Sequence, residues 1–185
     1  MTENTSRVGF IQGRLSPVKG GLLQEFPINS WQSEFGSGHS LGFSLIEWTV
    51  DQHTFNLNPI MTESGRAEIQ ELKNKFQIEI PSLTGDCFMQ SPFWIHEIGP
   101  IRDILESQFI KLATAASLIG VNYIVVPLVD NGSIRSKSQE KLLVSSFQRM
   151  GPKLMDLNLK VVFESDYGPL ELASLINKFS AEVYG

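Results

Sequence analysis

The sequence predicts an α/β fold with a parallel β-sheet in one domain spanning residues 1–185. Short runs rich in β-branched and aromatic residues alternate with longer segments of helical period, as in βαβ units. The runs recur roughly every 40 residues, which suits a strand, a helix and two loops per unit. Two architectures compete: an open doubly wound sheet of five strands, or a (β/α)8 barrel truncated after about five β/α units, because eight units need more than about 250 residues.

Five apolar runs predict the strands, and they cover residues 7–12, 42–50, 77–83, 121–129 and 159–165. The fourth and fifth runs are almost continuously apolar, which is typical of strands in a sheet covered by helices. Pro81 interrupts the third run, and proline cannot donate a hydrogen bond to a neighbouring strand. The last five residues, AEVYG, predict the start of a sixth strand.

Helical period predicts the intervening helices: near Ser30, over 63–76, from Pro100 to Gly120, over 138–157, and after Pro169. The helix that starts at Pro100 is the clearest, since proline suits the first helical position and glycine follows the last. Its apolar face is predicted to contain Ile101, Ile104, Leu105, Leu112 and Ile119.

Three sequence features predict irregularities. Gly36 and Gly38 are expected to weaken and shorten the helix near Ser30. Gly151-Pro152 predicts a kink or a break in the helix over 138–157. The segment 84–94 (TGDCFMQSPFW) lacks any period and predicts a long loop of the kind that forms lids or binds substrate.

Composition excludes several classes of protein. With 42% hydrophobic and 19% charged residues, the chain is neither disordered nor collagen-like. No apolar run approaches the roughly 20 residues of a membrane span, and the polar start has no signal-peptide core, so we expect a cytoplasmic protein without a membrane partner. The single cysteine, Cys87, agrees with a reducing compartment. The net charge of −5 argues against a nucleic-acid partner.

Candidate functional residues follow the predicted strands, because the loops at the carboxyl ends of parallel strands meet at one edge. Glu164 ends the run Val161-Val162-Phe163, where a carboxylate suits a divalent metal or proton transfer. The alternative is a carboxylate that meets solvent or pairs with a lysine. The other candidates are Gln12 and Arg14 after the first strand, Glu47 and Trp48 after the second, Thr84 and Asp86 after the third, and Asp166.

Each of these candidates also has a structural interpretation. Glu47 either contacts substrate or forms a structural ion pair, and Arg14 either binds a phosphate or carboxylate or holds its own loop. Asp86 lies in the long loop or in an exposed turn, while Cys87 is predicted to be a small buried apolar residue. The three histidines, at 39, 53 and 96, show no short metal-binding spacing. Neither GxGxxG nor GxxxxGK[ST] is present, which disfavours nucleotide binding.

Several strings together resemble a known family: GFIQGRLSP, LQEFPINSW, LGFSLIEWTVD, NPIMTESGRAEIQEL, IPSLTGDCFMQSPF and VVFESDYGP. They are similar to the N-terminal portion of sugar phosphate isomerase/epimerase proteins of the xylose isomerase-like TIM barrel superfamily. The resemblance implies a (β/α)8 barrel with one divalent metal, Mn, Zn, Mg or Co, and a sugar or sugar-phosphate substrate. In such enzymes two glutamates move a proton beside a carbonyl through an enediolate, whose charge the metal stabilises.

Carried onto this sequence, the resemblance makes Glu164 both the metal ligand and the acid/base. Glu47 corresponds to a position that faces the substrate, and Gln12, Arg14 and Asp86 correspond to positions at the barrel mouth. The family's other ligands, an aspartate on strand six, a histidine near strand seven and a glutamate on strand eight, have no counterpart within these 185 residues.

Three functions therefore remain open. The first is a sugar isomerase or epimerase, of which the isolated chain is expected to be an inactive partial barrel whose unpaired strand edges favour homo-oligomers. The second is a metal-dependent phosphodiesterase similar to apurinic endonucleases, which the acidic charge and scattered histidines disfavour. The third is a barrel fragment that serves as a binding or assembly module.

Overall fold

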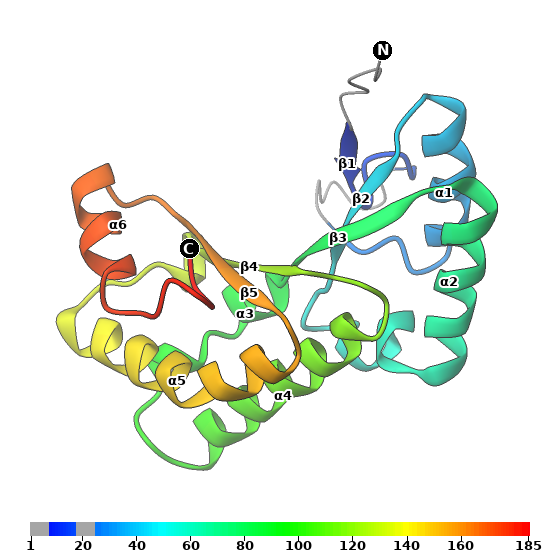
Figure 1. The fold of residues 1–185 in the computed structure, drawn as a ribbon. Coiled ribbons are helices and arrows are strands. Elements are labelled where there is room, and N and C mark those ends of the chain that lie inside the picture. The colour runs from blue at the N-terminus through cyan, green and yellow to red at the C-terminus, as the bar shows by residue number, and fades with distance from the viewer. Residues whose placement is uncertain (1–7, 18–24) are drawn as a thin grey trace.

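A computed structural model describes residues 8–17 and 25–185 and contains one parallel sheet in the order β1-β2-β3-β4-β5 (Figure 1). The strands are β1 (Gly9–Ile11), β2 (Leu45–Thr49), β3 (Glu79–Thr84), β4 (Tyr123–Leu128) and β5 (Lys160–Ser165). Each strand pairs with the next one in the chain, so the strand order does not reverse. In a doubly wound sheet the strand order does reverse. Of the two architectures, the barrel arrangement is confirmed.

Within the described residues, six α-helices connect or follow these strands: α1 (Trp31–Ser40), α2 (Glu63–Phe76), α3 (Asp86–Gln90), α4 (Pro100–Ser117), α5 (Lys137–Asp156) and α6 (Pro169–Ile176). Four single 3-10 turns add to them: η1 (Phe55–Leu57), η2 (Pro59–Met61), η3 (Phe93–Ile95) and η4 (Asp130–Gly132). Helices α1, α2, α4 and α5 cover one face of the sheet, the convex face (Figure 1). Right-handed crossovers that always advance in one direction place their helices on the same face.

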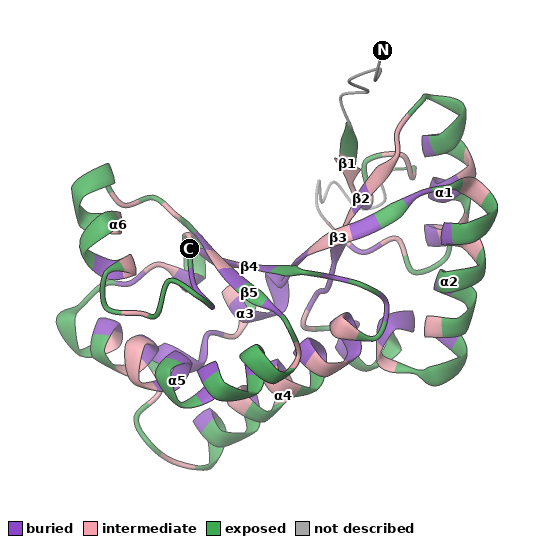
Figure 2. Cartoon of the chain, viewed as in Figure 1, coloured by how far each residue is buried: buried purple, intermediate pink, exposed green. Residues whose placement is uncertain are grey.

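The hydrophobic core lies between the convex face and these helices, as the burial colours show (Figure 2). An aromatic cluster fills its C-terminal half: the ring of Phe147 lies 5.2 Å from those of Phe109 and Phe163 and 5.4 Å from that of Phe93. The opposite, concave face of the sheet is more open, since Tyr123 on β4 is 45% exposed. Strand side chains alternate between the two faces.

The predicted start of a sixth strand is confirmed at the C-terminal end of the described residues. Tyr184 forms a parallel bridge with Val161 on β5. The backbone N–H of Val161 donates to the carbonyl of Val183 at 2.7 Å, and that of Gly185 donates to the carbonyl of Val161 at 2.9 Å. The C-terminal segment therefore extends the sheet beyond β5 in the parallel direction.

Two predictions about helices hold only in part. Of the apolar face predicted for α4, Leu105, Leu112 and Ile119 are buried as expected, but Ile101 and Ile104 are 61% and 60% exposed. Helix α5 runs without a break through Pro152. A proline removes one backbone hydrogen bond to the fourth residue before it, and that residue, Gln148, is exposed, so water can satisfy its carbonyl.

The segment 84–94 is not a lid. It folds into α3 and η3, and Asp86, Cys87, Phe88, Phe93 and Trp94 in it are buried. The segment consists of two short helical pieces, so the spacing of its apolar residues matches neither a long helix nor a strand. The predicted loop is therefore part of the core, and the burial predicted for Cys87 is confirmed.

Helix α1 keeps ten residues despite its two glycines. A Cβ atom added to Gly38 would lie 2.6 Å from Cε1 of Phe10, so this glycine allows α1 to approach β1 closely. Gly38 thus lowers the helix propensity of α1 but allows this helix to pack closely against Phe10 of β1. Strand β3 likewise continues through Pro81, and the β2–β3 pairing shifts register between Leu45 and Glu47.

Candidate active site at the carboxyl ends of the strands

Gln12 lies directly after β1 and ties it to β2. Its backbone N–H donates to the carbonyl of Glu47 at 2.9 Å, and its side-chain Oε1 accepts from the backbone N–H of Thr49 at 3.3 Å. Gln12 is fully buried, and its Nε2 has no partner in the described part of the chain. A buried amide donor without a partner costs stability unless a ligand or water accepts from it.

Glu47 on β2 is held by two hydroxyl groups from the neighbouring strand. Ser82 Oγ donates to Oε2 at 2.7 Å and Thr84 Oγ1 donates to Oε1 at 2.8 Å. The parallel register places Glu47 beside Ser82 and Thr49 beside Thr84. The half-buried carboxylate is therefore fixed in position on the concave face, and its partners are hydroxyls rather than the ion pair considered from the sequence.

Asp86 begins α3 and is 6% exposed. Burial, and after it the negative charges of Asp51, Glu164 and Glu47 in that order, raise the pKa of its carboxyl from 3.8 to about 7. Its Oδ2 has no partner among the described residues. Asp86 is thus close to half protonated near pH 7, so the same group can donate or accept a hydrogen bond.

Asp51 follows β2 and organises the segments around Asp86. Its Oδ2 accepts from the backbone N–H of Phe26 at 2.6 Å, and its Oδ1 accepts from Nε2 of Gln90, in α3, at 3.1 Å. The side chain is 1% exposed. Asp51 therefore connects the segment before α1 with the helix that carries Asp86.

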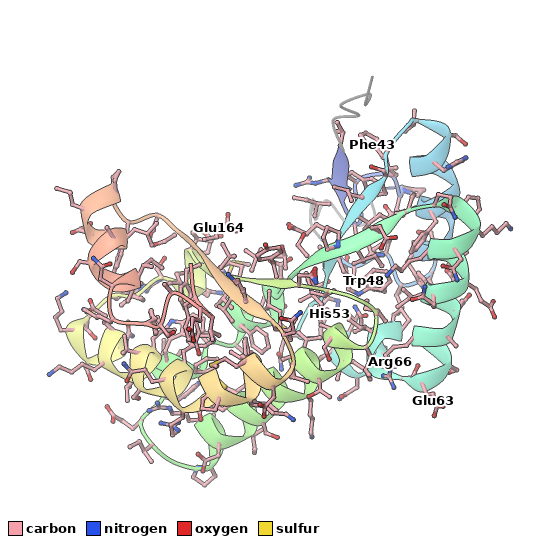
Figure 3. The ribbon with its side chains drawn as sticks, viewed as in Figure 1. Phe43, Trp48, His53, Glu63, Arg66 and Glu164 are labelled. Carbon is pink, nitrogen blue, oxygen red and sulfur yellow. The ribbon has the colours of Figure 1, made fainter. Side chains whose placement is uncertain are left out.

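Glu164 lies near the end of β5 and is exposed (Figure 3). It pairs in register with Pro127 on β4, and its neighbours Phe163 and Val161 point into the helix-covered core. Alternation along the strand therefore places Glu164 on the concave face. Within residues 8–17 and 25–185 it forms no ion pair, so the predicted lysine partner is not found there.

Arg14 is exposed in the turn after β1. The turn is held by Glu34 of α1, whose carboxylate accepts from the backbone N–H groups of Gly13 and Leu15 at 3.0 Å. Glu34 is fully buried, and burial raises its pKa although these backbone donors oppose the shift. The turn is thus held by Glu34, while the Arg14 side chain faces solvent.

Within the described residues, the polar groups at this edge of the sheet do not suffice for a metal centre. Among the described residues no three histidine, cysteine, aspartate or glutamate side chains converge in a way that could hold a metal ion. The His53 ring contacts Glu25 at 2.8 Å, and Cys87 is buried. A metal bound by Glu164 would need donors from outside these residues.

Sequence reasoning predicted Gln12, Glu47, Asp86 and Glu164 as site residues because each follows an apolar run, and their roles stay predictions. It missed Asp51 and Glu34, whose roles depend on backbone donors 25 and 19 to 21 residues away. The only available signal for Asp51 was its place directly after the second strand. Glu34 carried no signal, since an acidic residue in the first turn of a helix is ordinary.

No protein-family model and no curated protein matches the sequence. Several solved structures, however, match the fold of the chain. A D-psicose 3-epimerase crystallised in the presence of D-fructose is 12% identical with a TM-score of 0.68, over 95% of this chain and 61% of its own. A xylose isomerase domain protein from Planctomyces limnophilus is 14% identical with a TM-score of 0.63, over 96% and 60%.

A xylose isomerase-like TIM barrel protein from Mycobacterium smegmatis, in complex with magnesium, is 12% identical with a TM-score of 0.63. It is matched over 87% of this chain and 56% of its own. The chain thus spans about 60% of the length of the structures it resembles. TM-scores above 0.6 at this level of identity establish the fold alone: the chain folds as five consecutive β/α units of a TIM barrel, similar to those of these xylose isomerase-like structures.

Proposed function

We propose that the chain provides the sugar-binding and proton-transferring surface of a sugar isomerase or epimerase. The observation that carries the proposal is the acidic cluster Glu47, Asp86 and Glu164 at the carboxyl edge of the sheet, where TIM barrels place their active sites. Glu47 is immobilised by hydroxyl groups, Asp86 has a pKa of about 7, and Glu164 is exposed. The epimerase and xylose isomerase-like neighbours support it.

The proposed chemistry assigns one role to each group. Glu164 removes the proton from the carbon beside the carbonyl, the C–H electrons form the carbon–carbon double bond of an enediolate, and the carbonyl oxygen receives the displaced pair. Protonated Asp86 donates a hydrogen bond to a substrate oxygen, and Gln12 Nε2 donates another. Glu47 accepts from a sugar hydroxyl. Reversal of the same steps returns a proton to carbon.

The divalent metal that the resemblance implies, and a phosphate for Arg14, stay predictions. A magnesium complex is known for one neighbour, but the described residues supply no donor set of three. Arg14 is exposed and free to reach an anion. The cytoplasmic location is also a prediction; in the described part of the chain no helix is both long and apolar enough to span a membrane.

The first experiment is a saturation-transfer NMR measurement with D-fructose and D-psicose on the full chain. We expect transfer to the sugar protons and its loss in Gln12→Ala, because that variant removes the buried amide donor. Glu71→Gln, which neutralises an exposed carboxylate on α2, should bind like the parent. Transfer that is absent, or equal in both variants, would contradict sugar binding at this edge.

The second experiment separates an enzyme from a binding module. The sugars are incubated with the chain in D2O, and deuterium at the carbon beside the carbonyl is followed by NMR. One acid/base suffices for exchange on one face, so we expect deuterium uptake without net epimerisation, and loss of uptake in Glu164→Gln but not in Glu71→Gln. If the sugars bind but no sample takes up deuterium, the proton-transfer role is overturned and the chain is a binding module.

A further inference from the structure

A groove lies between α5 and α6, where Figure 1 shows α6 standing away from α5. It consists of two hollows of about 450 and 600 Å³. The smaller hollow lies between the N-terminal turn of α5 and one side of α6, and the larger one follows α5 from Lys137 to Gln148. Each volume is within the range of small-molecule sites, so this α5–α6 groove is large enough for a ligand.

The charged side chains that line the α5–α6 groove are mostly cationic. The cations are Arg135, Lys137, Lys141 and Lys178, and the carboxylates are Glu140 and Glu171. The whole chain has the opposite balance, with 15 lysines and arginines against 20 aspartates and glutamates. The groove is therefore a local positive region on a chain of negative net charge, and such a region attracts anions.

Glu140 lines both hollows and holds two of the cations in place. Its carboxylate, whose side chain is 8% exposed, accepts from Nζ of Lys137 at 2.8 Å and also from Nζ of Lys178. The hydrogen bond from Lys137, and after it the one from Lys178, lower the pKa of the Glu140 carboxyl, so it is ionised at neutral pH. Two ammonium groups on one carboxylate leave one positive charge in excess. Because Glu140 fixes both ammonium groups, a ligand does not have to order them on binding.

Arg135 and Lys141 add two further positive charges to the groove. Neither of them forms an ion pair within residues 8–17 and 25–185. The Arg135 guanidinium donates to the carbonyl of Asp130 at 3.3 Å, which leaves its charge uncompensated. With Glu171 counted against them, the lining side chains have a surplus of two positive charges.

The smaller hollow also has an apolar wall. Leu170 on α6 lines it and is 88% exposed. Tyr167, which is half-buried, lines it as well, and its hydroxyl donates to the carbonyl of Ile134 at 3.4 Å. A ligand with an apolar part beside its anionic group therefore finds complementary surface for both parts.

We propose that the α5–α6 groove binds a small organic phosphate monoester with an apolar body. The surplus of two positive charges matches the charge of a phosphate monoester, which approaches −2 above its second pKa of about 6. Arg135 offers the phosphate a planar fork of donors, and Leu170 contacts the apolar body. The groove shares no lining residue with the acidic cluster on the concave face, so the proposal does not depend on the proposed function.

The test is isothermal titration calorimetry of the full chain with phenyl phosphate and with inorganic phosphate, at pH 8 and low salt. We expect saturable binding of both, with phenyl phosphate the tighter because it also buries its ring. Arg135→Gln should weaken the binding of both ligands by about tenfold, since it removes a charged donor. Leu170→Ser should keep the binding of inorganic phosphate and reduce the preference for phenyl phosphate.

The matched control is Lys153→Gln, which makes the same charge change as Arg135→Gln at an exposed position of α5 outside the groove. It should bind both phosphates like the parent, and far-UV circular dichroism should show that all three variants fold like the parent, as expected for exposed positions. No saturable binding of phenyl phosphate overturns the proposal. Equal weakening in Arg135→Gln and Lys153→Gln also overturns it, because net charge alone then explains binding. A preference for phenyl phosphate that survives in Leu170→Ser overturns the apolar part of the site.

Discussion

The two faces of the sheet are built on different physical principles. On the convex face, Phe163 and Val161 of β5 are buried under the helices, and the ring of Phe163 lies 5.2 Å from that of Phe147 on α5. On the concave face, Glu47 is held by two hydroxyl donors and Glu164 is exposed. This difference indicates that packing on the helix side provides most of the stability. The concave side carries buried polar groups whose hydrogen bonds are incomplete, which is common in active sites.

The largest effect is expected on the convex face. Phe147→Ala should lower the free energy of unfolding by about 3–5 kcal/mol, because it leaves a cavity among rigid aromatic rings. Urea denaturation measures the loss. The control Leu170→Ala removes a side chain that is 88% exposed and should change the free energy by less than about 0.5 kcal/mol. Similar small losses in both variants would show that the helix layer is not closely packed.

Asp86 gives the next largest effect, with a pH dependence of defined sign. The folded chain keeps a proton on Asp86 up to about pH 7, whereas the unfolded chain releases it near pH 4. Stability should therefore fall as pH rises from about 4 to 7, by on the order of 4 kcal/mol at about 1.4 kcal/mol per pKa unit. Asp86→Asn, which cannot ionise, should be more stable than the parent at pH 8.

Urea denaturation of parent and variant at pH 5 and pH 8 checks this expectation. The gain from Asp86→Asn should be clearly greater at pH 8 than at pH 5. Asp156→Asn, at an exposed position at the end of α5, should shift stability equally at both pH values. If the two substitutions behave alike, the carboxyl of Asp86 is not held in its protonated form by burial.

The smallest effect concerns the hydroxyl groups around Glu47. Thr84→Val keeps the shape of the side chain but removes the donor to Oε1, and we expect a loss of about 1–2 kcal/mol in unfolding free energy. In Thr114→Val the lost hydrogen bond ran to the carbonyl of Ile110 in the same helix, and the change should stay below about 0.5 kcal/mol. Equal losses would mean that Glu47 gains no support from β3.

The candidate site divides into a part that the sequence predicted and a part that it did not. Gln12, Glu47, Asp86 and Glu164 were predicted as site residues because strand ends are visible as the ends of apolar runs. Asp51 was not predicted, because its role depends on accepting a hydrogen bond from the backbone N–H of Phe26, which lies 25 residues earlier. Contacts between a side chain and a distant backbone follow no local pattern, so no reading of spacing could have detected this one.

By itself, the sequence determined the order and approximate bounds of the elements. Helix α2 covers the predicted residues 63–76, because capping and periodicity are local properties of the chain. Only the tertiary structure decided that Ile101 and Ile104 face outward and that residues 84–94 are core. Periodicity relates residues within one element, but burial depends on which neighbour covers that element, and that is determined by the packing of the whole sheet.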